Sequence, residues 1–193
     1  LCAALLAGST FAYFTASSKV NIAITSGKVD VVATADGLKL WSLESIDPSS
    51  LTGTEVERTN DGTFINGGTA TMNGGNLTLD GITAGDRVSF NITIKNNSNI
   101  NVKYRVVVSA SYDEGLFNEL EMSFGDYKGK FISVWKNLAP GSEVETLDCS
   151  VGLPAESTVQ GKSCTVMFTV EAVQSNMAVQ DGVLAPIDVA SLK

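Results

Sequence analysis

The stretch GDRVSFNITIKNNSNINVKYRVVV, residues 85–108, decides the fold. Apolar side chains fill every second position on both sides of an Asn- and Ser-rich turn. These positions are Val88, Phe90, Ile92 and Ile94, then Val102, Tyr104, Val106 and Val108. The period of two predicts two long half-buried strands joined at the polar turn. One apolar and one polar face are typical of an antiparallel sheet that covers a core on one side.

The remaining sequence favours an all-β, antiparallel β-sandwich with one short helix and irregular Gly-rich loops. Residues 36–75 are rich in Asp-Gly, Asn-Gly and Gly-Gly turn signals, with only brief strand candidates between them. We expect one domain over residues 13–174 and a C-terminal tail over 175–193. The helix is predicted at 116–122, and the strands are predicted at 20–24, 28–33, 86–95, 100–110, 131–135, 143–151 and 164–173.

Composition limits the possible functions. The chain has 193 residues, a formal net charge of -8 and no histidine. Nucleic acid is a poor partner because phosphate binding needs clustered Lys and Arg, and only 13 such residues are spread along the chain. The missing histidine removes the commonest general base and zinc ligand, so we predict neither a catalytic site nor a cofactor.

The first twelve residues, LCAALLAGSTFA, resemble the C-terminal part of a signal peptide. Thr10 and Ala12 supply the small side chains at positions -3 and -1 of a cleavage site, so cleavage is predicted between Ala12 and Tyr13. The alternative is a short buried element of the mature fold. Cleavage implies a secreted protein that has no membrane contact afterwards.

Two cysteines suggest a disulfide. On the last two predicted strands, Cys149 and Cys164 each lie on the same face as the apolar residues of their strand. Their side chains are therefore expected to meet under the sheet as a structural disulfide. An acidic cluster at Asp113, Glu114, Glu119, Glu121 and Asp126 is interpreted as a solvated face, with weak cation binding as the alternative.

Several short segments resemble the TasA/camelysin family of secreted bacterial fibre proteins. They are the leader end GSTFAYF at 8–14, ITSGKVDV at 24–31, AGDRVSF at 84–90, KNNSN at 95–99, QGKS at 160–163 and VEAVQ at 170–174. The resemblance implies leader removal by a dedicated signal peptidase. It also implies a jelly-roll-like sandwich that polymerises into filaments of a biofilm matrix. Camelysin has been described as a metalloprotease, but this sequence has no His-Glu-x-x-His motif.

Three functions compete on these observations. The first is a structural subunit that self-associates, and also contacts other matrix or surface proteins. The N-terminal strand of one subunit, with Val20, Ile22 and Ile24, would add to a sheet edge of the next. The alternative for this strand is pairing within its own sheet. The other two functions are a metal-dependent peptidase and an adhesion module that presents its Gly-rich loops at 53–75 to a carbohydrate or a host protein. Exposure of Trp41 or Trp135 would favour sugar stacking.

Overall fold

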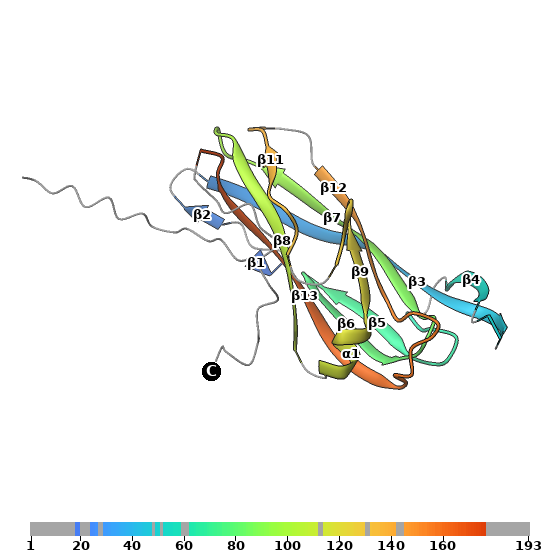
Figure 1. The fold of residues 1–193 in the computed structure, drawn as a ribbon. Helices are drawn as coiled ribbons and strands as arrows, with labels where there is room; N and C mark the ends of the chain where they lie inside the picture. The colour runs from blue at the N-terminus through green and yellow to red at the C-terminus, as the bar shows by residue number, and fades with distance from the viewer. Residues whose placement is uncertain are drawn as a thin grey trace, which may run out of the picture.

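The computed structural model shows two antiparallel sheets packed face to face, which confirms the predicted β-sandwich (Figure 1). It describes residues 18–19, 24–26, 29–47, 49–50, 52–58, 62–111, 114–129, 132–141 and 145–176. The long strands that follow residue 76 alternate between the sheets, so that consecutive strands cross the core. Among the described residues, no helix has the length and apolar character needed to cross a membrane.

The first layer, sheet A, is centred on the longest of its strands, β13. Its order is β11 (Lys136–Leu138), β8 (Val102–Ser111), β13 (Lys162–Gln174), β6 (Asn76–Ile82) and β5 (Thr69–Asn73). A further two-residue strand, β1 (Ser18–Lys19), pairs with β13 outside this order.

The second layer, sheet B, is centred on β7. Its order is β10 (Tyr127–Lys128), β9 (Glu121–Phe124), β12 (Glu145–Gly152), β7 (Arg87–Asn96), β3 (Val29–Asp47) and β2 (Ile24–Ser26). The far half of β3 pairs with β4 (Thr52–Arg58), and this hairpin projects beyond the sandwich (Figure 1).

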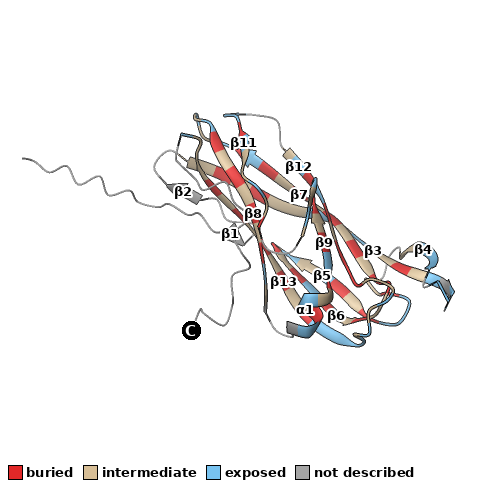
Figure 2. Cartoon of the chain, in the orientation of Figure 1, coloured by how far each residue is buried: buried red, intermediate tan, exposed pale blue. Residues whose placement is uncertain are grey.

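The core lies between the sheets, and the inward faces of the strands alternate with outward polar residues (Figure 2). All eight apolar side chains of the 85–108 stretch are buried, as their alternation predicts. Phe90 of β7 and Phe168 of β13 meet across the two layers in an edge-to-face contact with ring centroids 5.1 Å apart. Such aromatic pairs contribute about 0.5–1.5 kcal/mol beyond the area that they bury.

The prediction that the two strands of this stretch belong to one sheet is wrong. β7 pairs with β3 and β12 in sheet B, whereas β8 pairs with β13 and β11 in sheet A. The polar turn therefore crosses between the layers. Asn96 is buried there, and its Nδ2 donates to the carbonyl oxygens of Ile100 at 2.8 Å and Leu138 at 3.1 Å. These bonds hold the turn because a buried amide needs its partners inside the protein.

A second buried polar residue holds the other end of β7. The Asp86 carboxylate accepts hydrogen bonds from Ser42 Oγ at 2.8 Å and from the backbone N–H and hydroxyl of Thr83. This network ties the turn before β7 to the neighbouring strand β3. The two ends of the central strand are thus fixed by hydrogen bonds, and its middle is fixed by apolar contacts.

The region predicted to be least regular contains more strand than expected. The Asp36-Gly37 pair does not end a strand but forms a bulge inside β3, where the register with β7 shifts and Gly37 has a φ of 69°. Residues 52–58, which carry no regular alternation, form β4 through pairing with β3. Gly74 and Gly75 do form the expected turn, which joins β5 to β6.

The predicted helix and the strand after it are displaced. The helix α1 spans Glu114–Glu119, and Met122 belongs to β9, where it pairs with Val151 of β12. Ile132 makes one bridge to Val107, and the regular strand β11 begins only at Lys136. Pairing with distant strands, not local propensity, sets these boundaries.

Candidate assembly edge

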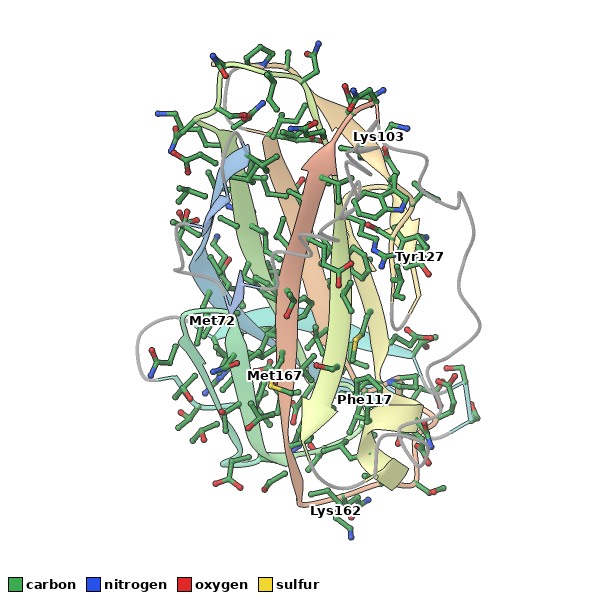
Figure 3. The ribbon with its side chains drawn as sticks, turned by 90° about the vertical axis from the view of Figure 1, so that its left-hand side faces the viewer. Met72, Lys103, Phe117, Tyr127, Lys162 and Met167 are labelled. Carbon is green, nitrogen blue, oxygen red and sulfur yellow. The ribbon has the colours of Figure 1, made fainter. Side chains whose placement is uncertain are left out.

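The two sides of β13 are paired to different extents. On one side, β8 pairs with it from Thr165 to Gln174. On the other side, β6 pairs with it only as far as Met167, because β6 begins at Asn76 directly after the turn. Figure 3 shows Met72, beside this turn, near the height of Met167, with β13 continuing well above both. The C-terminal half of β13 therefore has an edge that β6 does not cover.

Backbone hydrogen bonds show which residues face this edge. The N–H of Phe168 donates to the carbonyl oxygen of Gly75 at 2.8 Å, on the β6 side. The N–H of Ser175 donates to Asn101, on the β8 side. Because successive N–H groups of a strand point to opposite sides, Val170, Ala172 and Gln174 present their N–H and C=O groups to the edge that β6 does not cover.

Apolar side chains surround this edge on the inner side. Val170 and Ala172 are buried and point into the sandwich from β13. Val31 and Ala33 are buried on β3 of the opposite sheet. A strand placed beside this half of β13 would therefore bury apolar side chains, and its main chain would extend sheet A.

Part of the N-terminal segment occupies this edge in its own chain. Ser18 pairs with Val170, and Lys19 pairs with Thr169, so β1 takes the position that β6 leaves. A few residues later, β2 pairs with sheet B, where Ile24 lies opposite Val31 and Ser26 lies opposite Val29. The segment thus connects the two sheets at the open side of the sandwich, and β2 pairs antiparallel with the strand that follows it, β3.

Most of the predicted site residues lie outside the described residues. Ala12, Tyr13, Val20 and Ile22 are among them. Ile24 is described only through its backbone pairing in β2. The sequence predicts a donor strand but indicates no acceptor for it. The lengths of the two strands could have indicated the acceptor. The alternating segment at 164–173 is longer than the segment at 76–82 that borders it, so part of the longer strand has no partner in the shorter one.

The predicted disulfide between Cys149 and Cys164 is not formed. Both side chains are buried, as expected from their position on the apolar face of each strand, but β12 belongs to sheet B and β13 to sheet A. Cys149 lies beside Phe90, which contacts Phe168 across the layers, whereas Cys164 is four residues from Phe168 and thus roughly 13 Å away along β13. Burial raises the pKa of Cys149 to about 12, so this thiol is a core side chain and not a reactive group.

The features expected of a sugar site are poorly developed. An open groove of about 790 Å³ crosses the outer face of sheet B beside α1, and no aromatic side chain is present among the described residues that line it. Arg87 lies over the ring of Trp41 at 5.1 Å, and Arg105 lies over Trp135 at 4.6 Å. A guanidinium group therefore covers one face of each indole, which leaves less of it for sugar stacking.

No group of three or more Cys, Asp or Glu side chains that could hold a metal ion is present in the described part of the chain. Comparison with protein-family models, curated proteins and solved structures finds no match to this chain. The geometry of the β13 edge is therefore the main guide to function.

Proposed function

We propose that the protein is a secreted structural subunit that polymerises into extracellular filaments through strand addition at the β13 edge. The observation that carries the proposal is the unequal pairing of β13, which β6 leaves at Met167 and which, among the described residues, the two residues of β1 then continue. The predicted leader and the resemblance to secreted fibre proteins support the extracellular location.

The energetics favour exchange between chains. Within the part of the chain that the structure describes, releasing β1 from its own β13 breaks the backbone pairing of two residues, and each hydrogen bond has a net value of about 1 kcal/mol. A longer donor strand from a neighbouring chain could pair with Val170, Ala172 and Gln174 together. It would also bury alternate apolar side chains between the sheets, each contributing about 1.5–3 kcal/mol when fully buried.

The way in which the subunits would repeat along a filament follows from the positions of the donor and the acceptor in the chain. The donor lies at the N-terminus, and the acceptor is a strand near the C-terminal end of the domain, so the two surfaces are different. A contact between different surfaces of identical chains is heterologous, and it gives an open filament unless the rotation closes a ring. Val20, Ile22 and Ile24 are the apolar side chains that we assign to the donor.

Deletion of residues 13–24 tests the donor strand. We expect a folded, soluble protein that forms no filaments by negative-stain electron microscopy and sediments as a monomer. Deletion of residues 177–193 is the matched control at the other end of the chain, and it should retain assembly. Filaments that persist without residues 13–24 would contradict the proposed donor.

The acceptor can be tested without removing the donor. The substitution Ala172→Pro removes one N–H from the uncovered edge and leaves the bonds to β8 in place, so it should slow filament growth at unchanged secondary structure. A synthetic peptide of residues 13–26, added in excess, should cap the edge of the unmodified protein. If neither the substitution nor the peptide affects growth, β13 is not the acceptor.

A further inference from the structure

The chain's own β1 pairs with β13 in a register that suits its sequence poorly. Ser18 lies directly opposite Val170, and Lys19 lies opposite Thr169. Directly opposed residues of antiparallel strands lie on the same face of the sheet. Val170 is buried and points into the sandwich, so the position opposite it belongs to the inner face. A serine stands at this position, whereas apolar residues are favoured in the interior.

The apolar residues of the N-terminal segment, Val20, Ile22 and Ile24, continue the inner-face positions of β1 at every second residue. In the register of β1, the last two of them would lie opposite Val166 and Cys164. At those positions β6 is already paired with β13, which it borders as far as Met167 (Figure 3). These residues can therefore reach the edge that β6 does not cover only if the segment slides along β13.

The pattern of the segment determines the length of this slide. A slide by an even number of residues keeps the same positions on the inner face, whereas an odd number turns them outward. Beyond the reach of β6, the inner-face positions of β13 are Val170, Ala172 and Gln174. A slide of six residues, from Ser18 to Ile24 opposite Val170, matches all three to apolar residues. A slide of four would leave Ile24 opposite Phe168, whose N–H already donates to Gly75.

Small side chains surround the middle of these three positions. Ala172 is buried on β13, Ala33 is buried on β3 of the opposite sheet, and Ala35 packs against the same core. In the register of β1, Ala16 would also lie opposite Ala172, whereas the slide places Ile22 there. A large side chain facing small ones is the combination that fills a core to the usual density.

The slide also requires β2 to leave its partner. In its own chain Ile24 pairs with Val31 of β3. Because β3 and β13 belong to different sheets, Ile24 cannot pair with Val31 and with Val170 of another chain at the same time. The self-paired and exchanged arrangements therefore exclude each other, and the N-terminal segment has two states.

We propose that this segment caps the β13 edge of its own chain in the monomer and slides by six residues when it is exchanged between chains. In the exchanged register, the three apolar residues of one chain lie opposite the three inner-face positions of the next, which pairs Ile22 with Ala172. The self-capped register delays assembly, because β1 and β2 must both leave their partners first. This inference rests on the proposed function, since it specifies how the same donor and acceptor pair.

Engineered cysteines report the register, because a disulfide forms only between residues that lie close together. In filaments of the double variant Ile22→Cys with Ala172→Cys, oxidation should link successive chains and give a ladder on a non-reducing gel. Three other partners for Ala172→Cys report slides of zero, two and four residues, and they are Ala16→Cys, Ser18→Cys and Val20→Cys. Variants that do not polymerise alone are mixed with an equal amount of unmodified protein.

The outcomes separate the register from the proposed function. Before assembly, Ala16→Cys with Ala172→Cys should form a disulfide within one chain, because this is the register of β1. A ladder from any of the three other partners would overturn the slide of six residues but leave strand exchange at β13 in place. Filaments that give no ladder with any of the four partners would overturn both.

Two neighbouring serines provide a matched pair for the kinetics of assembly. Ser18→Ile adds an apolar residue opposite Val170 in the self-capped register, and it falls beyond the end of β13 in the exchanged one. Filament growth should slow by about tenfold, the effect of one further buried aliphatic side chain. Ser17→Ile makes the same change at the adjacent outer-face position and should leave the rate unchanged. Equal growth rates of the two variants would overturn the self-capping register.

Discussion

Arg105 and Arg87 lie on the outer faces of opposite sheets, and each contacts one tryptophan and one glutamate. Arg105 Nε binds Glu171 Oε2 at 2.6 Å and lies over Trp135, whereas Arg87 Nε binds Glu55 Oε1 at 2.6 Å and lies over Trp41. The ion-pair distances are equal. The exposed fractions of the side chains differ, at 14% and 14% for the first pair and 31% and 41% for the second.

The difference follows from the strands that carry the residues. Arg105 and Glu171 are direct cross-strand neighbours at the centre of sheet A. Arg87 instead reaches across β3 to Glu55 on β4, in the hairpin that projects from the sandwich. The same residue types at the same distance therefore experience different solvent screening, and their energies should differ.

The largest effect is expected from Glu171→Ala, which leaves the poorly exposed Arg105 guanidinium without its partner. We expect a loss of about 2 kcal/mol in the free energy of unfolding, between the values for a surface pair and a fully buried pair. Urea unfolding followed by circular dichroism measures it. Glu171→Gln, which keeps a hydrogen-bond acceptor, should lose less. Equal losses for both variants would show that charge alone is involved.

Trp135→Leu should have the next largest effect. It removes the indole beneath Arg105 but retains an apolar side chain, and we expect a loss of about 1 kcal/mol. Trp41→Leu is the matched change on sheet B. It should cost a similar amount, because Trp41 also donates a hydrogen bond from Nε1 to Ser89 Oγ at 2.9 Å. If Trp135→Leu left the free energy of unfolding unchanged, the indole ring would not contribute to the difference between the two groups.

Glu55→Ala should change stability by about 0.5 kcal/mol or less, as is usual for exposed ion pairs. The same urea experiment applies. A loss as large as that of Glu171→Ala would contradict the view that exposure sets the difference between the two groups.

Added salt should cause the smallest change in the free energy of unfolding, and it tests whether exposure explains the difference between the two ion pairs. At about 1 M NaCl the Debye length falls to about 3 Å, so the small contribution of Glu55 should disappear. The effect of Glu171→Ala should remain largely intact because its ion pair is shielded from solvent. Both variants are compared with the unmodified protein in low and high salt. Equal salt sensitivity of the two pairs would contradict the burial argument.

The proposed assembly edge and the environment of Tyr104 also show what a residue pattern predicts and what only its surroundings decide. The sequence predicts a donor strand at Val20, Ile22 and Ile24, whereas the acceptor that we propose is suggested only by the pairing of β6, which reaches no further along β13 than Met167. Tyr104 is one of the eight alternating core positions, and nothing in that pattern distinguishes it from its neighbours. Only the tertiary structure places its hydroxyl in the interior near the Glu145 carboxylate.

The sequence alone determined which side chains point inward, because a strand has a period of two that does not depend on its partners. It therefore predicted the sandwich and the buried positions of the stretch at 85–108, as well as the burial of Cys149 and Cys164. Strand partners were decided only by the tertiary structure, since strand pairing joins residues far apart in the chain. For this reason β7 and β8 lie in different sheets, and the two cysteines lie in opposite layers. Alternation fixes the direction of a side chain, whereas strand pairing and the packing of the two layers decide which inward side chains lie opposite one another and can touch.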